Sequence, residues 1–169
     1  MSVRFAVLTV SDRSARGERA DSSGPRLSNL LRSKGWDVIR QEILADDVRA
    51  LSEKLAQWAD EAVADVILTT GGTGFSPRDV TPEATLAVIE REAPGLAEAM
   101  RAASAAKSPH GMLSRARAGI RGHVLIINLP GSPDGAIENL EVVLPALEHA
   151  VQLLRDDPRS EAGHRKAVV

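Results

Sequence analysis

Short apolar runs of strand length recur along this chain, and amphipathic helical patterns lie between them. Apolar residues dominate positions 3–10, 66–68 and 124–129, and a weaker run covers 36–44. Strands that are buried on both faces have this continuous apolar character, and their alternation with helices is typical of a parallel sheet. The sequence therefore predicts an α/β fold in which helices cover a mostly parallel sheet.

Apolar residues at helical spacing fill most of the segments between these runs. Thr81-Pro82-Glu83 is a typical helix start, with a capping residue, a proline in the first turn and an acid near the positive end. The segment 108–122 carries prolines, glycines and arginines, so we expect it to be irregular or hairpin-like. The predicted helices cover residues 22–34, 51–62, 81–91, 95–107 and 137–154.

The length of 169 residues, 43% of them apolar, is sufficient for one buried core and short for two. We expect one domain over residues 1–155 and a flexible tail over 156–169, where apolar anchors are few. The net charge of −2 offers no general attraction to nucleic acid or anionic membrane, and 2% aromatic residues leave little for base stacking. The absence of cysteine excludes disulfides and thiolate chemistry. With no leader and no membrane-spanning run, we expect a cytoplasmic protein without a nucleic-acid or membrane partner.

A glycine-rich loop, Gly71-Gly72-Thr73-Gly74, follows the third apolar run directly. Glycines at this position let backbone N–H groups approach an anion, so the loop suits a phosphate, although a simple tight turn is the alternative. It is not a P-loop, because no Lys-Ser or Lys-Thr pair follows, and Ser76-Pro77 interrupts the dinucleotide-binding pattern.

Acidic residues follow two of the predicted strands. Asp79 lies just beyond the glycine loop, where it is either a turn residue or a Mg²⁺ ligand beside bound phosphates. Asp46 and Asp47 precede a helix, so we expect one of them to cap that helix and leave the other for a metal.

Polar loops also follow the first and last strands, at Ser11-Asp12-Arg13 and Pro130-Gly131-Ser132-Pro133. The carboxyl ends of parallel strands share one edge of a sheet, so four loops can build one site there, although each is also readable as a capped turn. Arg13, Arg78 and Arg115 are candidates to neutralise phosphate charge. The four histidines are too scattered for metal-ligand spacing, and no serine-hydrolase motif occurs.

Taken together, five runs in this order resemble the molybdopterin adenylyltransferase family, the Mog and MoaB-like proteins of molybdenum cofactor biosynthesis. The resemblance covers about residues 3–154. It implies a three-layer α/β/α fold, commonly trimeric, that transfers AMP from ATP to the terminal phosphate of molybdopterin with release of pyrophosphate. The runs are Thr9-Val10-Ser11-Asp12-Arg13, Leu68-Thr69-Thr70-Gly71-Gly72-Thr73-Gly74, Arg78-Asp79-Val80-Thr81-Pro82-Glu83-Ala84-Thr85, Leu113-Ser114-Arg115 and Asn128-Leu129-Pro130-Gly131-Ser132-Pro133.

The resemblance also implies roles for individual residues. Asp46 and Asp79 match the family's two important acids, so we expect them to be catalytic by holding or positioning Mg²⁺. An acid at position 46 favours the catalytic branch of the family. Ser114 matches the segment that lies beside the pterin. The residues expected to bind nucleotide or pterin are Ser11, Asp12, Thr70, Gly71, Gly72, Thr73, Gly74, Thr81, Ser114, Pro130, Gly131, Ser132 and Pro133.

Three rival functions remain open at this point. The same loops suit a molybdopterin carrier that does not consume ATP, or an enzyme that inserts molybdate into an already adenylated cofactor. A structural or nucleic-acid-binding role is disfavoured by the charge and the few aromatic residues. Because the chain is close to the family's minimal domain, we expect transient handover with molybdopterin synthase and a molybdate-insertion enzyme.

Overall fold

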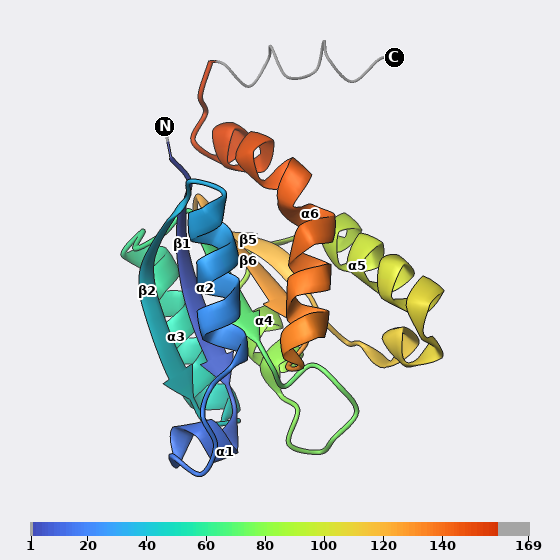
Figure 1. The fold of residues 1–169 in the computed structure, drawn as a ribbon. Helices are drawn as coiled ribbons and strands as arrows, with labels where there is room; N and C mark the ends of the chain where they lie inside the picture. Colours follow the sequence, from blue (N-terminus) through green and yellow to red (C-terminus); the bar gives the residue numbers. More distant parts are fainter. Residues whose placement is uncertain (1, 159–169) are drawn as a thin grey trace.

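The computed structural model describes residues 2–158, which form a six-stranded sheet covered by helices on both faces (Figure 1). The strands are β1 (Arg4–Val10), β2 (Asp37–Leu44), β3 (Val66–Thr70), β4 (Arg91–Glu92), β5 (Ala118–Arg121) and β6 (Val124–Leu129). The helices are α1 (Asp12–Ala15), α2 (Ser23–Ser33), α3 (Val48–Asp60), α4 (Thr81–Leu86), α5 (Pro94–Lys107) and α6 (Pro133–Leu154), with the 3₁₀-helix η1 (Pro109–Leu113).

The sheet has the strand order β2-β1-β3-β6-β5-β4. Neighbouring strands from β2 to β6 run parallel, whereas β5 is antiparallel to β6 and β4 is antiparallel to β5. The mostly parallel sheet is therefore confirmed. The hairpin-like character predicted for 108–122 is realised only at its end, where β5 turns into β6 through Gly122 with φ of +56°.

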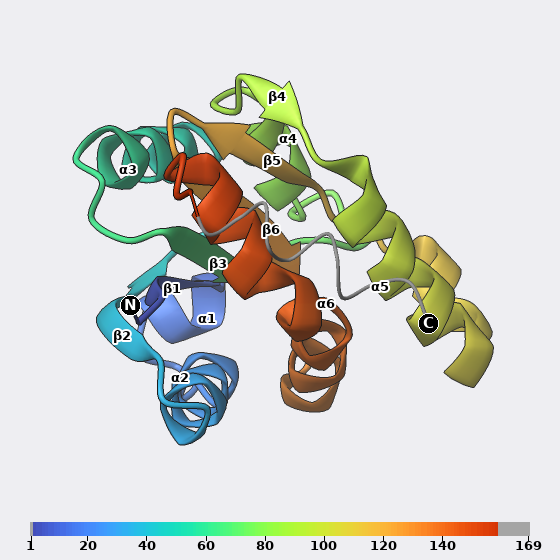
Figure 2. The same cartoon turned by 90° about the horizontal axis from the view of Figure 1, so that it is seen from above.

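Two apolar clusters fill the space between the sheet and its helices. On one face α2, α5 and α6 pack on the sheet, with Leu31, Met100 and Leu140 fully or almost fully buried. On the other face α3 and α4 do so, and Trp58 of α3 is completely buried. Figure 2 shows the resulting three layers from above, which confirms the α/β/α arrangement.

Two helix boundaries differ from the sequence prediction, namely the start of α6, at Pro133 instead of near 137, and the end of α4. Helix α3 begins at Val48, as expected for a helix capped by Asp46 or Asp47, because the Asp47 side chain accepts a hydrogen bond from the Ala50 N–H. The helix predicted over 81–91 ends at Leu86, since the chain leaves it to pair with β5 through the Glu90 N–H and the Ile120 carbonyl. Most of the predicted tail, residues 159–169, lies outside the described residues.

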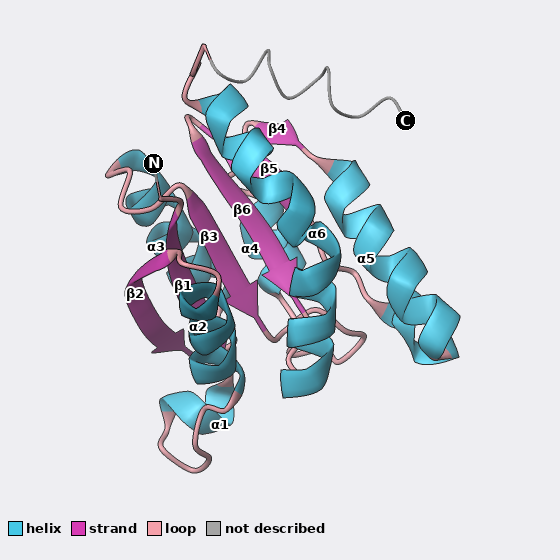
Figure 3. Ribbon diagram, turned by 45° about the horizontal axis from the view of Figure 1, so that its top comes forward, coloured by secondary structure: helices cyan, strands magenta, loops and turns pink. Residues whose placement is uncertain are grey.

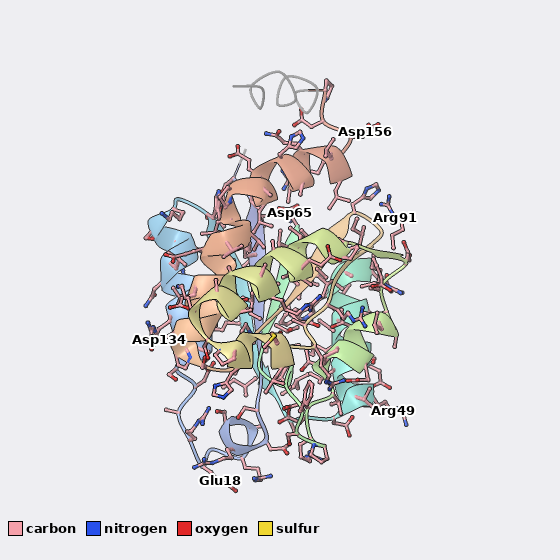
Figure 4. The ribbon with its side chains drawn as sticks, turned by 90° about the vertical axis from the view of Figure 1, so that its right-hand side faces the viewer. Glu18, Arg49, Asp65, Arg91, Asp134 and Asp156 are labelled. Atoms are coloured by element: carbon pink, nitrogen blue, oxygen red, sulfur yellow. The ribbon has the colours of Figure 1, made fainter. Side chains whose placement is uncertain are left out.

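The parallel strands all point toward the edge of the sheet where α1 lies (Figure 3). The loops that follow β1, β2, β3 and β6 meet there. The opposite edge holds Asp65, which Figure 4 shows far from Glu18 of the α1 loop. Within residues 2–158 no helix has the length and apolar character needed to cross a membrane.

Candidate functional site

Two cavities lie at the carboxyl edge of the sheet, one on each side of the glycine loop. The first, of about 450 Å³, is called the acidic cleft here because Asp21, Asp46 and Asp79 line it. The predicted site residues that line this cleft are Ser11, Asp46, Thr70, Gly71, Gly72, Asp79, Gly131, Ser132 and Pro133.

The second cavity, of about 340 Å³, lies between α5, η1 and the start of α6, and is called the α5–α6 cavity. Ser132 lines both cavities, so they adjoin at the start of α6. The predicted site residues that line the α5–α6 cavity are Thr73, Gly74, Ser114, Pro130 and Ser132.

The glycine loop separates the cavities in a conformation that requires glycine. Gly71 and Gly72 have φ of +106° and +64°, in the region that side chains disfavour. A Cβ on Gly71 would lie 2.2 Å from the Val10 carbonyl oxygen, and one on Gly72 would lie 3.0 Å from an Asp46 oxygen. The loop is tied from behind by Thr81, whose buried hydroxyl donates to the Gly71 carbonyl at 2.9 Å.

Asp46 and Asp79 both line the acidic cleft, with Asp46 next to Gly72 and Asp79 next to Gly74 of the glycine loop. An Asp46 oxygen accepts a hydrogen bond from the Asp12 N–H at 2.9 Å, and an Asp79 oxygen accepts one from the Ser76 N–H at 3.0 Å. Burial raises the pKa of Asp46, and repulsion from Asp12 and Asp79 adds to this, outweighing the hydrogen bond from Asp12. A bound cation would relieve this repulsion.

The helix cap expected of either Asp46 or Asp47 is present, whereas metal binding by the other acid stays a prediction. Asp47 caps α3, which leaves the Asp46 carboxylate facing the cleft. Within residues 2–158 no group of three or more histidine, aspartate or glutamate side chains is arranged to hold a metal. A metal bound by these two carboxylates would need further ligands from substrate phosphates or water, which is how Mg²⁺ commonly binds.

Two predicted ligand residues line neither cavity. Asp12 is paired with Arg78 at 2.8 Å and accepts a hydrogen bond from the Asp46 N–H, and this arrangement lowers its pKa, the Asp46 backbone contributing most. Thr81 is completely buried beneath the glycine loop. Both residues therefore support the loops of the site without lining a cavity.

The arginine candidates are placed differently from the expectation. Arg78 pairs with Asp12, and Arg115 pairs with Glu83, so both are already engaged with the protein. Arg13 lines neither cavity. Instead Arg19, which sequence reasoning missed, lines the acidic cleft and makes no hydrogen bond or ion pair with any described residue.

Some other residues that line the two cavities were not predicted from the sequence. Asp21 accepts hydrogen bonds from the Ser23 and Gly24 N–H groups at 3.1 Å. Its position directly before Ser-Ser-Gly-Pro, the start of α2, is the sequence pattern that could have identified it as a helix-capping acid. Lys107 and Asn139 line the α5–α6 cavity from two helices. No sequence pattern brings those two helices together, so only the fold could reveal them.

This geometry defines a class of protein, an α/β protein that binds ligands at the carboxyl edge of a parallel sheet. The family model described as "Probable molybdopterin binding domain" matches residues 6–149. The chain belongs to this family.

Several proteins are similar over most of the chain. The molybdopterin adenylyltransferase of Helicobacter pylori (strain J99) is 40% identical over 155 residues, which are 90% of this chain and 88% of that protein. The crystal structure of the molybdopterin biosynthesis enzyme MoaB from Thermus thermophilus has 47% identity and a TM-score of 0.86, over 92% of this chain and 98% of that one.

A longer relative contains the same domain. Gephyrin of Dictyostelium discoideum is 40% identical over 164 residues that cover 91% of this chain. The chain spans only 23% of the length of that protein, so the match concerns one part of it.

Proposed function

We propose that this protein is a molybdopterin adenylyltransferase, which transfers AMP from ATP to the terminal phosphate of molybdopterin and releases pyrophosphate. The observation that carries the proposal is the pair of adjoining cavities, because a reaction between two substrates needs two sites that meet. The names and the 40% identity of the adenylyltransferase relatives support the same activity.

We assign the triphosphate of ATP to the acidic cleft. The Gly71-Gly72 backbone borders this cleft, and Ser132, which caps the 22-residue helix α6, places the positive end of that helix at its margin. The α5–α6 cavity then takes molybdopterin, in agreement with the expectation for Ser114.

We assign Mg²⁺ to Asp46 and Asp79, which line the same acidic cleft and whose negative charges repel each other. When bound there, Mg²⁺ would supply positive charge to the α-phosphate and to the departing pyrophosphate. The raised pKa of Asp46, caused first by burial and then by the neighbouring Asp12 and Asp79, supports a cation at this position.

The protein's part in the reaction is to position both substrates and to stabilise charge. A molybdopterin phosphate oxygen forms a bond to the α-phosphorus of ATP, and the bond from that phosphorus to the bridging oxygen breaks, so pyrophosphate leaves with the electron pair. Ser132 and the glycine loop lie where the cavities adjoin, so this junction is where the two phosphates would meet. Neither aspartate is required as a nucleophile.

Other features of the family remain predictions for this chain. They are a homotrimeric assembly, a cytoplasmic location, and transient handover with molybdopterin synthase and a molybdate-insertion enzyme.

Pyrophosphate release from ATP and Mg²⁺, with and without molybdopterin, tests the proposal. We expect release only when molybdopterin is present, and loss of release in Asp79→Asn. Tight molybdopterin binding without any pyrophosphate would favour the carrier function. A requirement for molybdate together with release of AMP would favour metal insertion.

A further inference from the structure

Arg115 lines neither cavity itself, but it donates hydrogen bonds to residues that line both of them. It follows η1 closely, and the preceding residues Leu113 and Ser114 line the α5–α6 cavity. Its side chain reaches the segment 73–79, which ends in Asp79 of the acidic cleft. One residue therefore contacts the structure around both proposed substrate sites.

Arg115 donates hydrogen bonds to both ends of the segment 73–79. Its backbone N–H donates to the Thr73 carbonyl at 2.8 Å, and its Nε–H donates to the Gly74 carbonyl at 2.8 Å. Its Nη2 group donates to the Asp79 carbonyl at 2.7 Å. The same guanidinium pairs with Glu83 of α4, and the hydrogen bond from Arg115 lowers the pKa of Glu83.

Besides Arg115, the main anchor of the segment 73–79 is its own Arg78, whose side chain pairs with Asp12 and donates to the Asp46 carbonyl at 3.0 Å. Residues 75–78 are exposed, including Phe75 at 68%. Among the described residues, no residue outside this segment other than Arg115 donates a hydrogen bond to its backbone carbonyls. The fork of a guanidinium is suited to this task, because its donors lie in one fixed plane.

We infer that Arg115 is a positioning residue, which holds Asp79 in place and makes that placement depend on the segment bordering the α5–α6 cavity. The inference rests on the proposed function for its catalytic consequence. Without Arg115 the carbonyls of Gly74 and Asp79 lose their partner, and the exposed loop gains freedom that moves the Asp79 carboxylate. Displacement of a catalytic group by about 1 Å can lower a rate by about 100-fold.

Arg115→Ala and Arg115→Lys, with Arg117→Ala as the matched control, test this inference. Within residues 2–158 the Arg117 side chain makes a 3.4 Å contact with exposed Glu92 and no hydrogen bond to segment 73–79. We expect Arg115→Ala to lower kcat by about 10- to 100-fold with a much smaller change in KM for either substrate. Lysine should restore only part of kcat, because it keeps the charge without the fork. Arg117→Ala should match the wild type.

Two readouts separate this role from loss of fold and from failure of the proposed function. If kcat per folded molecule is unchanged in Arg115→Ala, the inference is wrong. Amide hydrogen exchange of residues 73–79 does not depend on activity, and we expect it to quicken in Arg115→Ala but not in Arg117→Ala. If the wild type releases no pyrophosphate, the proposed function fails, and unchanged exchange in Arg115→Ala would then overturn the inference as well.

Discussion

Asp46 occupies a position that is unfavourable for an ionised carboxylate in the protein alone. Burial raises its pKa, with repulsion from Asp12 and Asp79 in addition. Because the pKa of Asp46 is raised in the folded state, the protonated carboxyl group favours folding more than the ionised one does. This contribution to stability is lost as the pH rises through the folded pKa. At neutral pH the charge of Asp46 therefore opposes folding, which is understandable if its role is to bind a cation.

Asp46→Asn should consequently raise the melting temperature of the metal-free protein while lowering kcat by at least about 100-fold. Asp47→Asn is the matched control, because Asp47 caps α3 and asparagine also caps helices. Thermal unfolding and pyrophosphate release measured on both variants check this. A lower melting temperature in Asp46→Asn, or full activity, would contradict the account of this residue.

Arg19 is the cation that we expect to contact the ATP phosphates. It lines the acidic cleft, it makes no hydrogen bond or ion pair within the described part of the chain, and the charged residues that line the cleft with it are aspartates. Arg19→Ala should raise KM for ATP about tenfold and leave KM for molybdopterin unchanged. Arg13→Ala is the control, since Arg13 lines neither cavity. An equal rise in KM for ATP in both variants would show that positive charge near the site matters and that no specific contact from Arg19 does.

At the scale of elements, Asp65 joins two strands and the last helix at the edge opposite the site. It is 6% exposed, accepts hydrogen bonds from the Arg4 N–H at 2.8 Å and the Arg155 Nε–H at 3.1 Å, and directly precedes β3. Burial by itself would raise the pKa of Asp65, but the hydrogen bonds from Arg155 and Arg4 outweigh it, so that the pKa is lowered. Its carboxylate therefore stabilises the fold above the unfolded pKa, and this stabilisation is lost as the pH falls through the folded value.

Asp65→Asn should lower the free energy of unfolding by about 2 kcal/mol at pH 7, because two arginines lose a buried ionic partner. The difference from the wild type should begin to shrink as the pH falls below the unfolded pKa of about 4, and it should disappear once the pH has passed the lower pKa of the folded state. Denaturant unfolding across this pH range measures it. The control Asp60→Asn removes an exposed pair with Arg121 and should cost much less. A constant difference at all pH values would argue against a role for the charge of Asp65.

The elements also show what the sequence could and could not predict. Continuous apolar runs and turn residues located β1, β3 and β6 well, because burial on both faces imposes that composition. The end of α4 at Leu86 was missed, since it depends on pairing of the Glu90 N–H with a distant strand. Arg115 was expected to face phosphate, whereas it holds the glycine loop, and no local pattern distinguishes these two uses of an arginine.

At the scale of the whole molecule, the parallel order β2-β1-β3-β6 explains why loops far apart in sequence share one edge. That gathering was predictable from the rule for parallel sheets. The separation of the edge into two cavities was not, because it depends on how α5, η1 and α6 close on the glycine loop. The central claim of a transferase depends on this division into adjoining sites.

The most direct test follows the α-phosphorus of ATP. The protein is incubated with Mg²⁺, molybdopterin and ATP labelled at that phosphorus, and the products are separated and identified by mass. We predict that the label appears in an adenylated pterin, with one pyrophosphate released for each label transferred. Recovery of the label as free AMP, or entirely as unreacted ATP while molybdopterin is bound, would contradict the account.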